Sequence, residues 1–118
     1  MPESPIVAME PRSNLVVIQI LVESLGEEQL RRLQAEVRAA ADANPGKPVA
    51  LDFSRVSFLP SLSLAALIRI HSEIHKRQRL ILAGLQPQVR NVFVMTRLDR
   101  LFELHENVDA AQRAVQPV

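Results

Sequence analysis

Three sets of polar side chains in the sequence could do chemistry, and each set predicts a different kind of site. Ser61 and Ser63 lie where an apolar run ends and a helical pattern begins, as regulatory hydroxyls can. His71 and His75 are four residues apart, which is the spacing of two metal ligands on one helix face. Asp52 lies inside an apolar run, where a carboxylate could act as a catalytic acid.

The two serines are predicted to stand at the start of a helix. Unpaired backbone N–H groups and the positive end of the helix dipole at such a position would favour an added phosphate. Ser61 is therefore a candidate phosphorylation site, and Ser63 is the second choice. The alternative is a plain helix cap, a position that serine favours on its own account.

The histidine pair does not complete a metal-binding motif. Ser72 stands where a zincin would have its glutamate, Glu73 lies on another helix face, and His105 is remote in the sequence. Short metal motifs often match by chance, so we expect a solvated or core-edge histidine pair. We expect no metal and no cofactor.

Catalytic constellations are missing from the sequence. Asp52 has no partner base nearby, and at a strand end its carboxylate can accept backbone N–H groups, so we expect a structural role. There is no Gly-rich phosphate loop and no nucleophile elbow, and the absence of cysteine excludes thiolate catalysis and cysteine-ligated zinc. We therefore expect a binding protein and not an enzyme.

Length and composition limit the class of protein further. The 118 residues, 47% of them hydrophobic, suit one domain over residues 1–118. A net charge of +1 and the lack of Trp and Tyr argue against nucleic acid as a direct partner. The longest apolar-dominated run, Leu15 to Val22, is far shorter than the roughly 20 residues of a membrane-spanning helix. We expect no membrane span and a cytoplasmic location.

Strand-like and helix-like patterns alternate along the chain. Apolar runs of strand length predict strands at 6–9, 15–21, 49–53, 80–83 and 102–105. Helical periodicity and caps predict helices at 27–43, from 64 to 74, from 87 to 96, and at 108–114 with Asn107 as the cap. This alternation predicts an α/β domain with a four- to five-stranded mixed sheet, about four helices and an N-terminal edge hairpin.

Specific side chains are expected to face the core or a partner. The second helix should bury Leu64, Leu67, Ile68 and Ile74, and the inner face of the third should carry Val89, Val92, Phe93 and Thr96. The basic cluster at 75–79 either serves the helix C-terminus or steers an acidic partner.

Two segments carry a family pattern. Residues 49–54 read Val-Ala-Leu-Asp-Phe-Ser, and Pro-Ser-Leu-Ser-Leu follows at 60–64. Residues 80–104 run from a strand through Leu-Gln-Pro-Gln-Val to Thr-Arg-Leu-Asp-Arg-Leu-Phe and a second strand. The chain thereby resembles the STAS domains of anti-sigma factor antagonists, stressosome proteins and anion-transporter tails. The two segments cover a little over a third of the chain.

The resemblance implies a switch that binds proteins. Its unmodified form would bind an anti-sigma factor that is a serine kinase, and phosphorylation of Ser61 would release that partner. The implied partner-binding residues are Leu59, Pro60, Ser61, Leu62, Ser63 and Glu23. Pro60 replaces the aspartate that the family carries before its serine. This favours the alternative, a STAS scaffold that is not phosphorylated, as a homo-oligomer or as a subunit of a regulatory or lipid-transport assembly.

Overall fold

The apolar runs pair side by side in a five-stranded sheet. The computed structural model describes residues 4–116 and places the strands in chain order: β1 (Val7–Pro11), β2 (Val16–Ile20), β3 (Val49–Asp52), β4 (Leu80–Ala83) and β5 (Glu103–His105). β1 runs antiparallel to β2 as an edge hairpin, and β2 to β5 are mutually parallel. The predicted mixed sheet and edge hairpin are therefore confirmed.

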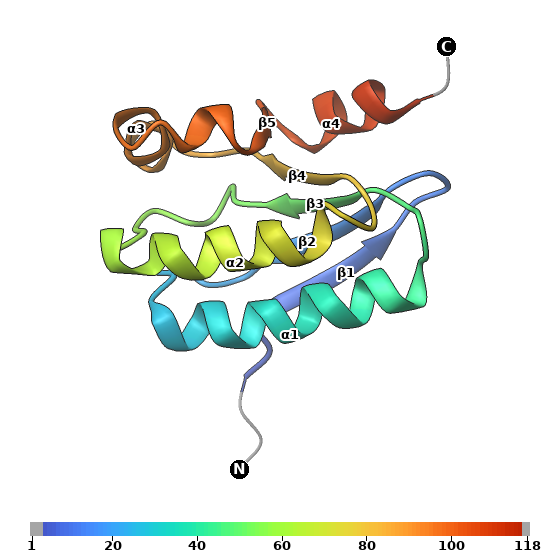
Figure 1. Cartoon of the computed structure of the whole chain (residues 1–118), viewed down its shortest axis with the longest axis horizontal. Coiled ribbons are helices and arrows are strands. Elements are labelled where there is room, and N and C mark those ends of the chain that lie inside the picture. The colour runs from blue at the N-terminus through green and yellow to red at the C-terminus, as the bar shows by residue number, and fades with distance from the viewer. Residues whose placement is uncertain (1–3, 117–118) are drawn as a thin grey trace.

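Four α-helices and two short 3₁₀ helices lie between or after the strands within residues 4–116. They are α1 (Glu27–Ala43), η1 (Ser61–Ser63), α2 (Leu64–Ile74), α3 (Pro87–Met95), η2 (Leu98–Arg100) and α4 (Val108–Val115). α1 and α2 lie side by side (Figure 1). The Asn107 side chain caps α4 by accepting the Ala110 N–H at 2.8 Å, as predicted.

Alternate side chains of each central strand enter two separate cores. Val49 and Leu51 of β3 belong to the larger core beneath α1, α2 and α3. Ala50 points to the opposite face, where Ala111 of α4 completes a smaller core. β3 is therefore covered on both faces, as its nearly continuous apolar run predicted.

Three local expectations were wrong. The first strand was predicted to end at residue 9, but β1 continues to Pro11, because an edge strand tolerates a residue without an N–H. Thr96 is exposed at the end of α3, where its hydroxyl donates to the Val92 carbonyl at 2.6 Å. On α2, Ile70 is fully buried and Ile68 is only half-buried.

The parallel strands bring several loops to one edge of the sheet. The chain segments that follow β2 and β3, at 21–26 and 53–60, leave from the carboxyl ends of neighbouring strands. Within residues 4–116, no helix is long and apolar enough to cross a membrane. The predicted domain also includes residues 1–3 and 117–118, which lie outside the described residues.

Candidate functional site

The segment at 53–60 carries the chain from β3 to Ser61 and is anchored at its start. The Phe53 N–H donates to the Ala83 carbonyl at 2.8 Å, and the Val56 N–H donates to the Phe53 carbonyl at 2.9 Å. The side chains of Phe53 and Val56 are fully buried. The path toward Ser61 is therefore fixed by the core beneath it.

The loop after β2 is bound to this segment. The Glu23 carbonyl accepts the N–H groups of Ser57 at 2.8 Å and Phe58 at 3.1 Å, and the Leu25 N–H donates to the Phe58 carbonyl at 3.0 Å. The Glu23 side chain is exposed. Two segments far apart in the sequence thus lie together, which places Glu23 beside the segment that leads to Ser61. A partner-binding role for Glu23 stays a prediction.

Ser61 heads the helical segment without acting as its cap. It is the first residue of η1, which continues directly into α2. Its side chain is exposed, and its hydroxyl has no hydrogen-bond partner within residues 4–116. The expected helix N-terminus is present, while the plain-cap alternative is wrong for Ser61. A phosphate here would meet the first-turn N–H groups and the positive end of the helix.

Two residues expected on the partner surface are buried. Ser63 is 1% exposed and its hydroxyl has no hydrogen-bond partner, so a kinase cannot reach it in this conformation. Leu59 is 4% exposed and packs in the larger core. The turn of η1 directs Ser63 inward, and the bridge between Ser24 and Phe58 fixes which side chains of this segment face the core.

Phe58 takes the place of Leu59 at the surface. It is 59% exposed, and Leu62 is 82% exposed. Sequence reasoning missed Phe58 because adjacent apolar residues carry no signal that says which of them is buried. We use the name Ser61 surface for the exposed or half-buried set formed by Glu23, Phe58, Pro60, Ser61 and Leu62.

A charged groove lies beside the Ser61 surface, between α1 and α2. Its volume is about 320 Å³, and it is lined by Glu27, Arg31, Gln34, Leu62, Ala65, Ala66 and Arg69. Arg31 forms an ion pair with Glu28 at 3.2 Å. Because Leu62 belongs to both features, a protein docked on the Ser61 surface could also place a side chain in this groove.

Asp52 has the predicted structural role. Its Oδ1 accepts the Ser54 N–H at 3.0 Å, which turns the chain after β3. Gly84, with a φ of +76°, passes so close that an added Cβ would lie 3.3 Å from Asp52 Oδ1. The carboxylate therefore stabilises the turn after β3, and the turn at Gly84 packs closely against it.

The histidine pair lies at the edge of the core. The rings of His71 and His75 stack with centroids 4.5 Å apart, and His75 Nδ1 donates to the His71 carbonyl at 2.8 Å. Burial, and secondarily the charge of His75, lower the pKa of His71. His105 instead contacts Glu103 at 2.8 Å. Across residues 4–116, no three His, Cys, Asp or Glu side chains are grouped to hold a metal ion.

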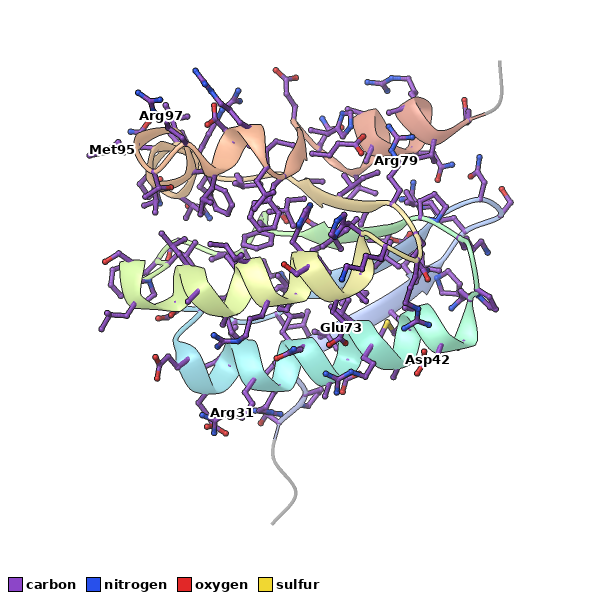
Figure 2. The ribbon with its side chains drawn as sticks, in the orientation of Figure 1. Arg31, Asp42, Glu73, Arg79, Met95 and Arg97 are labelled. Carbon is purple, nitrogen blue, oxygen red and sulfur yellow. The ribbon has the colours of Figure 1, made fainter. Side chains whose placement is uncertain are left out.

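The basic cluster at 75–79 is used mainly inside the fold. Arg77 pairs with Asp42 of α1 at 2.6 Å, and Arg79 binds both carboxylate oxygens of Glu103 on β5. Figure 2 labels Asp42 near the C-terminal end of α1 and Arg79 just before β4. These contacts favour structural use over steering of an acidic partner.

Comparisons with known proteins agree with the fold. The sequence model of the STAS domain family matches residues 12–111. The chain belongs to the STAS domain family. No curated protein matches this STAS chain.

Several solved structures share the architecture. An anti-sigma factor antagonist from Mycobacterium paratuberculosis is 22% identical with a TM-score of 0.80, over 94% of this chain and 93% of the other. The anti-sigma factor antagonist SpoIIAA in its unphosphorylated form is 21% identical, with a TM-score of 0.72 and coverage of 95% and 98%. SpoIIAA of Bacillus in its phosphorylated form is 20% identical, with a TM-score of 0.63 and coverage of 92% and 98%. At these identities, the likeness establishes the STAS fold.

Proposed function

We propose that this STAS domain is a protein-binding switch of the anti-sigma factor antagonist type. The unmodified Ser61 surface binds an anti-sigma factor that is also a serine kinase, and a sigma factor is thereby freed. Phosphorylation of Ser61 ends the complex. In this proposal the protein acts in the cytoplasm in transcription regulation, and the chemistry of phosphate transfer belongs to the partner.

One observation carries the proposal: an exposed hydroxyl lies among exposed apolar side chains. Ser61 is flanked by Leu62, which is 82% exposed, and the same surface includes Phe58, which is 59% exposed. Exposed apolar patches mark protein interaction sites. A phosphate adds a charge of about −1.5 to −2 at pH 7, and burying that charge without a cation at an apolar interface costs several kcal/mol. Modification would therefore release the partner without refolding this chain.

The similar structures support the same kind of regulation. SpoIIAA, which shares this fold, occurs in an unphosphorylated form and in a phosphorylated form. By analogy, the serine that heads the helical segment here is the residue to modify. Pro60 nevertheless supplies no carboxylate beside Ser61.

Pro60 favours a second candidate function. A kinase that needs a neighbouring carboxylate to orient the hydroxyl would find none in the preceding residue. In that case the Ser61 surface packs permanently against a neighbour, either another copy of this chain or a subunit of a regulatory or lipid-transport assembly. This scaffold would bind its neighbour in the absence of any phosphate.

Binding measurements with charge variants test the switch. Purified anti-sigma kinases encoded in the same genome would be titrated calorimetrically with the wild-type protein, Ser61→Ala and Ser61→Glu. We expect one kinase to bind the wild type and Ser61→Ala with similar affinity. Ser61→Glu should bind it about 100-fold more weakly, which corresponds to about 3 kcal/mol.

A matched control adds the same charge elsewhere on the helix. Ser72 is exposed and lies eleven residues after Ser61, so Ser72→Glu places a carboxylate roughly 16 Å along the helix from the surface. This variant should bind as the wild type does. Equal affinities for Ser61→Glu and wild type would contradict the switch, and a stable complex of all variants with a non-kinase neighbour would support the scaffold.

A further inference from the structure

A second exposed apolar surface lies at the end of α3, separate from the Ser61 surface. Three of the large hydrophobic side chains that are exposed within residues 4–116 occur in one short stretch: Val94 at 48%, Met95 at 83% and Leu101 at 42%. Figure 2 shows Met95 directed away from the ribbon at the outer end of α3. We name this region, residues 90–101, the α3–η2 surface.

The α3–η2 surface is held by the core below it and by hydrogen bonds along its backbone. Phe93 and Phe102 are buried, and their rings meet edge to face with centroids 5.5 Å apart. The Thr96 hydroxyl donates to the Val92 carbonyl, and the Leu101 N–H donates to the Leu98 carbonyl at 3.0 Å. The backbone that carries the exposed side chains is therefore held in place by the core and by these hydrogen bonds.

The same surface is basic. It carries three exposed arginines and one aspartate, Asp99, which gives a net charge of +2. Within the part of the chain that the structure describes, none of these arginines forms an ion pair or a side-chain hydrogen bond; they are Arg90, Arg97 and Arg100. By contrast, Arg38, Arg77 and Arg79 all pair with carboxylates.

Arg97 also occupies an unfavourable backbone conformation. Its φ of 62° and ψ of 18° are left-handed, and it is the only non-glycine residue with a positive φ among those described. This position just after a helix is one that glycine normally fills without steric cost. Keeping an arginine there costs stability, which points to a use for its side chain at the surface.

We infer that the α3–η2 surface binds an acidic amphipathic segment of another protein. Exposed methionine and arginine are the residue types that protein interfaces favour. The apolar side chains would receive the apolar face of the segment, and its carboxylates would meet Arg97 and Arg100. This inference rests on α3 and η2 alone and does not depend on the role of Ser61.

Other occupants fit the observations less well. Two copies of the chain that paired through this patch would place a net charge of +2 against +2. A membrane surface would call for a longer helix with a free apolar face, whereas α3 has nine residues and buries Val89 and Phe93 in the core. An acidic protein segment satisfies both the charge and the small apolar area.

Fluorescence anisotropy with designed peptides tests the inference. The probe is a labelled 14-residue helical peptide with leucines on one face and glutamates beside them, and the control peptide has lysines in place of the glutamates. The full chain should bind the glutamate peptide but not the lysine peptide. Its affinity for the glutamate peptide should fall as the salt concentration rises. Met95→Asp and Arg100→Gln should each weaken binding roughly tenfold.

Arg97→Gly separates binding from folding. It should raise the melting temperature by relieving the left-handed strain, and yet weaken binding of the glutamate peptide. Arg31→Gln, in the groove between α1 and α2, should leave binding unchanged. Equal binding of both peptides, weakened binding in Arg31→Gln, or unchanged binding in the Met95 and Arg97 variants would overturn the inference. Met95-dependent binding to anionic phospholipid vesicles or Met95-dependent dimerisation, with no peptide binding, would overturn it as well.

Discussion

Two serines separated by one residue have opposite environments, and this difference decides which of them can be modified. Ser61 offers a free hydroxyl to solvent, whereas Ser63 is 1% exposed with no partner for its hydroxyl. A buried hydroxyl without a hydrogen bond keeps its full desolvation cost. Ser63 therefore weakens the fold slightly while Ser61 is open to a partner.

Replacement of the buried hydroxyl should not harm the protein. We expect Ser63→Ala to leave the free energy of unfolding unchanged or to raise it by up to about 1 kcal/mol, since an unsatisfied polar group is removed. Urea denaturation monitored by circular dichroism measures this. Ser61→Ala is the exposed control and should change it by no more than about 0.5 kcal/mol. A clear loss of stability in Ser63→Ala but not in Ser61→Ala would reveal a hydrogen bond to the Ser63 hydroxyl. It would refute the claim that this hydroxyl is unsatisfied.

His71 should make stability depend on pH. Burial, and then the charge of His75, lower its pKa below 6.5 in the folded protein. The folded protein therefore favours the neutral His71 ring. The resulting contribution to the free energy of unfolding is fully present above the pKa that His71 has in the unfolded chain. It is lost as the pH falls through the lower pKa of the folded protein. Between pH 7 and 5, the unfolding free energy of the wild type should fall more steeply than that of His71→Gln. Identical slopes for the two proteins would show that His71 titrates as it does in the unfolded chain.

At the scale of elements, local signals determine helices well. α1 spans Glu27–Ala43 and α3 begins at Pro87, as predicted, because caps, prolines and apolar periodicity act within one or two turns. The Asn107 cap of α4 follows the same rule. α4 in turn supplies Ala111 to the smaller core, so its cap supports one whole face of the sheet.

Loss of this cap should measurably weaken the fold. Asn107→Ala removes the acceptor of the Ala110 N–H, and we expect the free energy of unfolding to fall by about 1 kcal/mol. Thermal and urea denaturation both report it. Asn91→Ala on the exposed side of α3 is the matched control, with an expected change within about 0.5 kcal/mol. Equal stability of the two variants would mean that the cap contributes nothing.

At the scale of the whole molecule, contacts between distant segments complete the site. The fold followed from the sequence because strand and helix patterns are local and their alternation permits few topologies. The exposure of Phe58 and the burial of Leu59 could not be predicted from the sequence, since both depend on hydrogen bonds between the segments at 21–26 and 53–60. Likewise, no local pattern places Arg97 in a left-handed conformation.

The central claim is that charge on Ser61 controls the affinity of the surface around it. Native mass spectrometry of the protein mixed with the proposed anti-sigma kinase, before and after addition of ATP, reports both the complex and the phosphate. The account predicts a complex without ATP, then one phosphate per chain on Ser61 and loss of the complex, with Ser61→Ala remaining bound throughout. A complex that persists after Ser61 has been fully phosphorylated would contradict it.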